Sequence, residues 1–335
     1  MSDFQNNKSL IRRFYEELDT ASLDGINNVL ERYTAPDYYW RGMHPFYEQQ
    51  GSDAVGEVFW KPFRRAFSSI QRRQDVFMAG VSNVDGNGET QWVCSMGHLM
   101  GLFDSHWLGI PPTGKMGFLR YVEFNKINDG QITETALFCD IVSVMKQAGL
   151  NPLPEQTGVT VITPGPRTHD GLLFDQQDPL ESQKTRDLID RMLNDLTSAG
   201  LHSTQDELSG TWHDDMIWWG PAGIGATYTL TRYEKQHQGP FGAGLDDIKY
   251  TGHVCRFSEG SYGGFFGWPN LTMKSSGGFM GLPGSDKKTE MRVVDIYRRE
   301  GDKLAENWIF IDVLHFLYLQ GLDVLERMRQ INEIE

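Results

Sequence analysis

The sequence predicts an α+β protein with two tandem copies of one domain, each with helices packed on a curved, mostly antiparallel sheet. Two observations carry this prediction. The chain of 335 residues repeats itself once along its length, and each copy places amphipathic helices before strand-like segments. A repeat of about 150 residues is the size of a whole domain, because solenoid repeats span only about 20–50 residues.

The repeat appears when the chain is aligned with itself at two slightly different shifts. A shift of 172 positions pairs identical residues in the later part of each copy, namely Gly109 with Gly281, Arg120 with Arg292, and Asp140 with Asp312. A shift of 178 positions aligns the earlier part and pairs Trp40 with Trp218. We therefore expect a loop between Gly42 and Gly80 to be six residues longer in the first copy.

The repeat also predicts the domain boundaries. We expect domains at residues 1–150 and 181–335, joined by a linker over 151–180. The linker matches nothing in the second copy and contains five prolines and three glycines. This composition disfavours regular structure, so the segment should run extended across the surface.

Helices open each copy. In the first copy, apolar residues at helical spacing predict helices over 10–18 and 26–33. A third helix should begin at Ser52 or Asp53, and Pro62 should bend or end it. The corresponding stretch of the second copy, 227–237, has a weaker helical pattern.

Strand-like segments with turns between them follow the helices. In the first copy they span 90–100, 118–127 and 132–144, with turns at 85–88 and 128–130. In the second copy they span 253–257, 262–273, 290–298 and 304–314. With the helices on one face of this sheet, the concave side is free to form a pocket.

The composition disfavours several classes of function. With a net charge of −14 there is no basic surface for nucleic acid, and the arginines at 64, 65, 72 and 73 are interpreted as a solvated helix face. No segment approaches the ~18 apolar residues of a membrane span, and the N-terminus lacks the apolar core of a signal peptide. Three scattered cysteines are too few for a disulfide framework or a zinc site. We therefore expect a cytoplasmic protein that binds no nucleic acid, membrane, metal or cofactor.

A family pattern is visible in the first copy. The segment 107–115 reads Trp-Leu-Gly-Ile-Pro-Pro-Thr-Gly-Lys, and Arg120, Glu134 and Asp140 follow it. This pattern resembles the SnoaL-like polyketide cyclase family of the nuclear-transport-factor-2-like superfamily. The second copy keeps the same frame, with Gly281, Pro283, Arg292, Glu306 and Asp312 at the matching positions.

The resemblance implies two cone-shaped α+β barrels, each with a pocket at its mouth. The superfamily includes cyclases, isomerases, hydrolases and proteins that only bind or assemble, so fold alone does not transmit the chemistry. Because members commonly dimerise through their sheets, the two copies should pack as an intramolecular pseudo-dimer. A homodimer of whole chains is left open.

Asp140 and Asp312 are the first candidates for catalysis. Alternate residues of a strand share a face, so Asp312 should point the same way as Glu306, Trp308 and Phe310. Apolar surroundings desolvate a carboxyl group and suit it to proton transfer. The resemblance implies that this aspartate is the general acid and base of an intramolecular aldol closure. The alternative is a carboxylate that accepts backbone hydrogen bonds at the end of its strand.

His98 is the third catalytic candidate, since a neutral imidazole can polarise a carbonyl or relay a proton; the alternative is a satisfied core or rim histidine. The ligand-binding candidates are Trp40, His44, His106, Trp107, Arg120, Trp218, Trp219, Trp268, Asn270, Arg292 and Trp308. The aromatic members could form an apolar pocket wall or belong to the core. His237 and His253 are weaker candidates.

These features support two hypotheses about function. The first is a cofactor-independent cyclase or isomerase that acts on a small hydrophobic carbonyl or polyketide-like compound. The alternative is a ligand-binding or assembly protein without catalysis, because the copies differ: Ala136 stands opposite Trp308, and His98 opposite Asn270. One working copy, supported by the other, is a third possibility.

Overall fold

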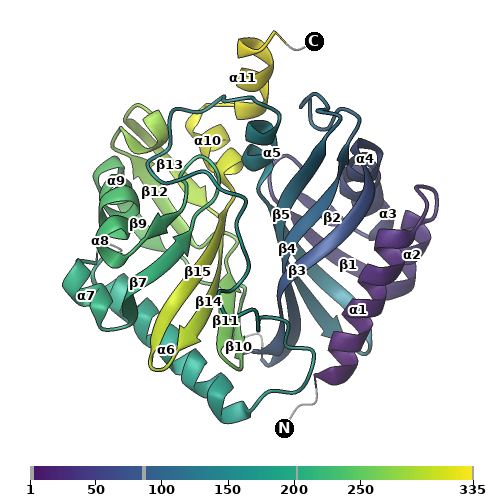
Figure 1. Cartoon of the computed structure of the whole chain (residues 1–335), viewed down its shortest axis with the longest axis horizontal. Coiled ribbons are helices and arrows are strands. Elements are labelled where there is room, and N and C mark those ends of the chain that lie inside the picture. The colour runs from purple at the N-terminus through teal and green to yellow at the C-terminus, as the bar shows by residue number, and fades with distance from the viewer. Residues whose placement is uncertain (1–3, 85–87, 201–202, 334–335) are drawn as a thin grey trace.

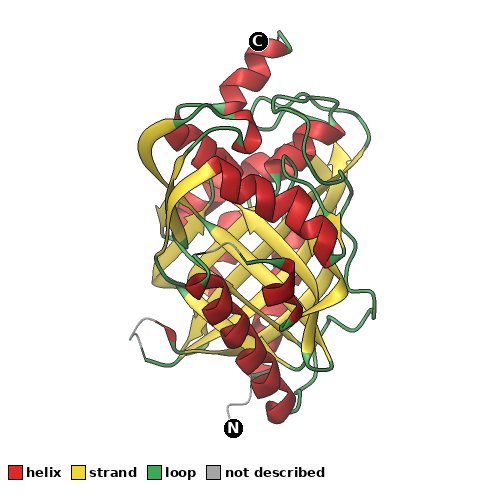
Figure 2. Cartoon of the chain, turned by 90° about the vertical axis from the view of Figure 1, so that its left-hand side faces the viewer, coloured by secondary structure: helices red, strands yellow, loops and turns green. Residues whose placement is uncertain are grey.

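The computed structural model describes residues 4–84, 88–200 and 203–333. Two curved sheets pack against each other in the middle of the molecule, and helices cover the outer face of each (Figure 1). Seen from the side of the second copy, helices lie in front of the crossing strands (Figure 2). The fold is therefore the predicted pair of α+β units, packed as a pseudo-dimer.

The first copy is built around a six-stranded sheet with the order β2-β1-β6-β5-β4-β3. Its helices are α1 Gln5–Thr20, α2 Ile26–Tyr33, α3 Ser52–Val55, α4 Lys61–Ala66 and α5 Ile141–Gln147. Its strands are β1 Thr34–Gly42, β2 Glu48–Gln50, β3 Phe67–Ser82, β4 Thr90–Phe103, β5 Met116–Asn128 and β6 Gln131–Cys139. Strand β1 runs parallel to β6, and the other pairs are antiparallel.

The structure corrects several local predictions in this copy. The third helix passes into a π-helical turn, Gly56–Trp60, and Pro62 lies in the first turn of α4, where a proline is tolerated. The strand predicted to reach 144 ends at Cys139, because α5 begins two residues later. Arg72 lies in strand β3 rather than on a solvated helix face. The turn predicted at 85–88 falls largely on 85–87, outside the described residues.

The second copy repeats this strand order in two pieces. Its helices are α6 Pro179–Ser198, α7 Gln205–Ser209, α8 Leu230–Tyr233, α9 Gly239–Gly244, α10 Val313–Gln320 and α11 Val324–Ile331, with a π-helical turn at Glu234–Gln238. Its strands are β7 Trp212–Trp219, β8 Thr227–Tyr228, β9 Leu245–Tyr250, β10 Cys255–Glu259, β11 Tyr262–Phe266, β12 Leu271–Ser275, β13 Ser285–Met291, β14 Val293–Glu300 and β15 Lys303–Ile311. The order is β10-β11-β14-β15-β7-β8, with β13-β12-β9 as a separate sheet.

The six-residue difference between the copies lies inside a strand, not in a loop as expected. Phe67 begins β3 and Leu245 begins β9 at the 178 shift, whereas Gly80 and Gly252 match at the 172 shift. The long strand β3 is therefore shortened in the second copy and divided into β9 and β10. The neighbouring strands divide at the same level, so the wall of the second cone is split across its middle.

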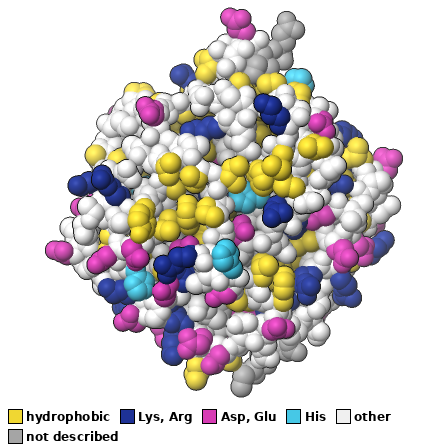
Figure 3. All heavy atoms as spheres, in the orientation of Figure 1, with side chains coloured by type: hydrophobic (Ala, Val, Ile, Leu, Met, Phe, Trp, Pro, Cys, Tyr) yellow, Lys and Arg dark blue, Asp and Glu magenta, His cyan; other side chains and the backbone are white. Residues whose placement is uncertain are grey.

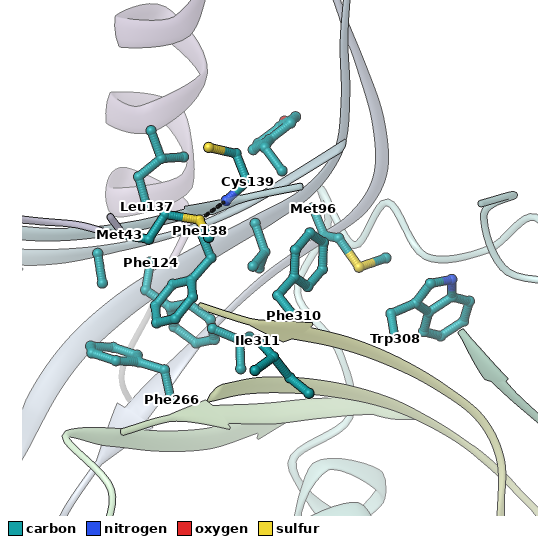
Figure 4. Close-up of a cluster of buried hydrophobic side chains, with 14 of the residues drawn as sticks. Met43, Met96, Phe124, Leu137, Phe138, Cys139, Phe266, Trp308, Phe310 and Ile311 are labelled. Carbon is teal, nitrogen blue, oxygen red and sulfur yellow. Dashed lines mark hydrogen bonds between the residues drawn. The ribbon is translucent and has the colours of Figure 1, made fainter. Parts of the chain in front are cut away.

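Apolar side chains from both sheets form the core between the copies. Figure 4 shows Met96, Phe124 and Phe138 of the first copy facing Phe266, Trp308 and Phe310 of the second, all buried. The ring centres of Phe124 and Phe266 are 5.1 Å apart. A buried ion pair joins the copies as well, with Lys8 Nζ 2.5 Å from Glu259 Oε1.

The segment from 151 to 178 has no helix or strand and crosses the seam between the sheets (Figure 1). It is held by isolated bridges from Leu172 to Phe77 and from Val159 to Ala226, and by the Trp308 indole, which donates to Pro164 O at 3.0 Å. Figure 3 shows apolar side chains across the middle of this face. None of the helices in the described ranges is long and apolar enough to cross a membrane.

Candidate functional site

A cavity of about 130 Å³ lies inside the second cone, between helix α6 and the inner face of the split sheet. Its walls are mostly apolar and aromatic. They include Met192, Leu196, Trp212, Trp218, Tyr233, His237, His253, Phe265, Asn270, Tyr297, Ile309 and Ile311. Residues on both sides of the split contribute, so the division of the strands shapes this space. A concave, mostly apolar space with few polar groups is the usual form of a small-molecule site.

Asp295 is the carboxyl group in this cavity. It lies on β14, where alternation also turns Tyr297 inward, and Tyr297 stands opposite Asn307 of β15. Asn307 Nδ2 donates to Asp295 Oδ1 at 3.0 Å. Burial raises the pKa of Asp295 to about 7, although the hydrogen bonds from Asn307 and Tyr297 oppose the rise. Near neutral pH this carboxyl group can therefore both accept and donate a proton.

Two buried histidines line other parts of the cavity wall. His237 stacks on Trp218 with ring centres 3.9 Å apart, and His253 stacks on Phe265 at the same distance. Among the described residues, neither Nδ1 atom has a hydrogen-bond partner. Burial lowers the pKa of both histidines to about 3, so both are neutral at physiological pH. Each ring can offer a donor or an acceptor to a ligand.

The matching space in the first copy is filled by Arg72. Its guanidinium carbon lies 3.9 Å from the ring centre of Tyr15 and 5.1 Å from that of Tyr121. Arg72 Nε is 2.9 Å from Asp19 Oδ2, and Arg72 Nη1 is 3.8 Å from Glu123 Oε2. The side chain of Arg72 thus fills the first cone with a buried, paired cation.

The repeat shows that the two spaces correspond. Five residues surround the Arg72 guanidinium: Tyr15, Asp19, Trp60, Tyr121 and Glu123. Their repeat counterparts are Leu193, Thr197, Gln238, Val293 and Asp295, all of which line the second cavity, and Tyr250 takes the position of Arg72. The first cone is therefore closed and the second open.

The predicted catalytic aspartates lie at the interface between the copies, outside the second cavity. Asp140 caps α5, with Oδ1 accepting from Ser143 N at 2.9 Å, and its Oδ2 accepts from Ala222 N of the second copy at 2.8 Å. Asp312 mirrors this arrangement: it caps α10 through His315 N at 3.2 Å and accepts from His44 N of the first copy at 2.9 Å. Each aspartate thus ties its own helix to the other copy, which matches the alternative of backbone hydrogen bonding at the strand's end.

The two faces of strand β15 meet different surroundings. Trp308 and Phe310 do share a face, but that face packs against the first copy (Figure 4). The alternate residues Asn307, Ile309 and Ile311 point into the cavity. A sheet buried on both faces has no polar side, so periodicity could not tell the interface from the pocket.

Three predicted residues, His98, Arg120 and Asp140, do come together under the strap of residues 159–163. His98 Nδ1 lies 3.6 Å from Asp75 Oδ2, while Arg120 Nη2 donates to Trp219 O at 3.0 Å. The space between them is about 10 Å³, which holds about one water molecule. These residues therefore line no ligand-sized space.

The other predicted ligand-binding residues separate into three groups. Trp218 and Asn270 line the second cavity. Five are buried in the core or between the copies: Trp40, His44, Trp107, Arg292 and Trp308. Trp219 and Trp268 are half-buried beside the interface. His106 is exposed.

Asp295, Tyr233, Tyr297 and Asn307 were missed by sequence reasoning. A signal for Asp295 was present, because the repeat aligns it with Glu123, and both acids stand among apolar strand residues. An acid kept inside a buried strand needs a partner or a function.

Comparison with known proteins supports the assignment of the first copy. The family model described as SnoaL-like polyketide cyclase matches residues 9–148. No curated protein matches the chain. A solved structure from Jannaschia sp. CCS1, described as a SnoaL-like polyketide cyclase, is 25% identical over 42% of this chain and 90% of its own, with a TM-score of 0.32. An NTF2-like protein from Burkholderia thailandensis E264 is 15% identical over 43% and 97%, with a TM-score of 0.31.

The family match and the repeated strand order describe the two copies in different ways. The match covers the first copy, and the second copy has the same order of strands around its own cone. Residues 9–148 thus match the family model of the SnoaL-like polyketide cyclases, and a second α+β unit with the same order of strands follows them.

Proposed function

We propose that the second copy is the working one and that it binds a small, neutral carbonyl compound, with Asp295 as the group that moves a proton. The observation that carries this proposal is the buried carboxyl group of Asp295 in an apolar cavity, hydrogen-bonded to Asn307. The first copy, whose cone is filled by Arg72, then serves as support.

The difference between the cones indicates that the ligand is neutral. The first cone surrounds a cation with Tyr15, Trp60 and Tyr121, which favour cations through their ring faces. In the second cone the counterparts of these three residues are Leu193, Gln238 and Val293, so the set of rings that surrounds the Arg72 cation is not repeated. In the described part of the chain, no lysine or arginine lines the second cavity, so an anion is disfavoured as well.

The chemistry follows from the position of Asp295. The ionised carboxyl group would take a proton from a carbon next to the ligand carbonyl, and the electron pair of the broken C–H bond would move onto the carbonyl oxygen. The protonated carboxyl group would then return the proton to that oxygen or to another carbon. Return of the proton to a different carbon gives an isomerisation. In a ring closure the enolate carbon would instead attack the carbon of a second carbonyl, and the protonated carboxyl group would give its proton to the oxygen of that carbonyl.

Hydrogen–deuterium exchange next to a carbonyl tests this proposal. We expect the full chain in D2O to exchange the α protons of cyclohexanone faster than buffer alone, as followed by NMR. Asp295→Asn should reduce the protein-dependent rate by about 100-fold or more, because one acid–base group supplies about that factor. Asp140→Asn is the matched control, since it makes the same chemical change outside the cavity, and it should keep the rate.

Two results would change the conclusion. An unchanged exchange rate in Asp295→Asn would overturn the catalytic role of this residue. Binding of the ketone to the cavity without any exchange would favour the alternative, a ligand-binding protein without catalysis.

A further inference from the structure

One face of strands β4 and β5 extends beyond the second copy. Alternate residues of a strand share a face, and Trp92 of β4 and Phe124 of β5 both contact Phe266, with ring centres 5.6 and 5.1 Å apart. Further along β5, the Arg120 guanidinium carbon lies 4.1 Å from the ring centre of Phe310. The pairing of β4 with β5 continues without a register shift, so the same face runs on to the far end of both strands.

Apolar side chains at this far end are exposed. Leu102 of β4 and its pairing partner Met116 of β5 are 43% and 57% exposed. The strap of residues 159–163 lies beside Phe118 on the same face, and three of its apolar side chains are exposed as well. Figure 3 shows apolar side chains gathered on the face that the strap crosses. Together they form an apolar end patch, defined by Leu102, Met116, Val159, Val161 and Ile162. Contiguous exposed apolar surface marks an interaction site.

The second copy has lysines where the patch has its two strand residues. The 172 shift aligns Leu102 with Lys274 of β12, and Met116 with Lys288 of β13. Lysine side chains keep such a surface solvated and disfavour association. The same surface is therefore charged in the second copy and apolar in the first, so the fold itself does not require the apolar side chains.

We propose that the apolar end patch is the centre of a homodimer interface, in which two whole chains pack patch to patch about a two-fold axis. The occupant is a second copy of the chain, because the same face of β4 and β5 already packs on an α+β unit with the same order of strands, and the patch continues that interface. An isologous contact pairs the patch with itself and needs no second surface. The five side chains carry no charge, so two chains of net charge −14 can meet there without placing like charges in contact.

The size of the patch indicates the strength of the dimer. Five partly exposed side chains supply less than the ~800 Å² per partner of a standard interface, so polar surface around them must complete the contact. We therefore expect a reversible dimer with a Kd of about 1–100 µM.

Sedimentation velocity of the full chain tests the proposal, at concentrations from about 1 to 300 µM that span this range. We expect a monomer–dimer equilibrium that stops at two chains, because an isologous contact closes on itself. The dimer should persist in about 1 M NaCl, since salt screens charge pairs and leaves apolar contacts in place.

Variants connect the dimer to the patch. Leu102→Lys combined with Met116→Lys introduces the residues of the second copy and should raise the Kd by about 100-fold or more. The two-fold axis places four altered side chains in the contact, and each loses about a factor of five. Leu102→Gln combined with Met116→Gln should weaken the dimer in the same direction without adding charge. Leu180→Lys is the matched control, since it makes the same change at an exposed leucine of α6 outside the patch, and it should leave the equilibrium unchanged.

Three results would overturn the proposal. The first is a monomer at every concentration. The second is a dimer that the lysine and glutamine variants leave intact while urea unfolding shows them as stable as the wild type, because the contact would then lie elsewhere. The third is a dimer that dissociates in about 1 M NaCl, because charged groups would then hold it. Each result is independent of the proposed function, since Asp295 lies inside the second cone.

Discussion

The burial of Asp295 makes a prediction about stability that does not depend on a substrate. Its pKa rises from 3.8 to about 7 in the folded protein, mainly because of burial. Below pH 3.8 the carboxyl group is protonated in both the folded and the unfolded protein, so it stabilises neither relative to the other. Between these values the unfolded chain releases the proton while the folded protein keeps it, so the free energy of unfolding falls as pH rises.

The magnitude follows from the shift. A pKa difference of one between the folded and unfolded protein is equivalent to about 1.4 kcal/mol. The rise in the pKa of Asp295 from 3.8 to about 7 therefore lowers the free energy of unfolding by about 4 kcal/mol between pH 4 and pH 8. Asp295→Asn has no charge to bury and does not show this fall. The variant should therefore gain up to about 4 kcal/mol relative to the wild type over this pH range.

Urea unfolding of both proteins at pH 4, 5.5, 7 and 8 measures this difference. Burial also raises the pKa of Asp312 to about 7, but that group is present in both proteins and its contribution cancels. A difference between wild type and variant that is the same at every pH would refute the reasoning, because it would show that Asp295 titrates normally in the folded protein.

Two further predictions concern the interface and the filled first cone. Asp140→Ala and Asp312→Ala should each lower the free energy of unfolding by about 1–3 kcal/mol, since each removes a helix cap and an interdomain acceptor; a loss below about 0.5 kcal/mol in urea unfolding would contradict this. Arg72→Met should lower the free energy of unfolding by about 3–5 kcal/mol, because it leaves Glu123 buried without its cation. Adding Glu123→Gln should recover part of that loss, and equal losses in the single and double variants would argue against the pairing.

The chain's own repetition made much of the fold predictable. Matched positions such as Trp40 and Trp218, or Asp140 and Asp312, imply two copies of one domain from the order of residues alone. The helices over 10–18 and 26–33 lie within α1 and α2, because their apolar faces cover the sheet. Local boundaries were less predictable: Asp140 begins a helix, although the apolar residues after it look like a continuing strand.

The candidate site was mostly hidden from the sequence. Both faces of each central strand are buried, one in the cone and one between the copies, so Asp295 and Asp312 look equally suitable in an apolar strand. Only the packing of the sheets shows that the carboxyl group of Asp312 accepts backbone hydrogen bonds from its own helix and from the other copy. The same packing leaves Asp295 facing the cavity.

The sequence by itself determined that this protein has two copies of one α+β unit and that they differ by six residues. Only the tertiary structure decided what that difference does. The missing residues divide a strand, the sheet splits at that level, and Tyr250 stands where the first copy has Arg72. Whether a cone is filled or open depends on side chains far apart in the chain that meet in its interior, and no local pattern encodes such a meeting.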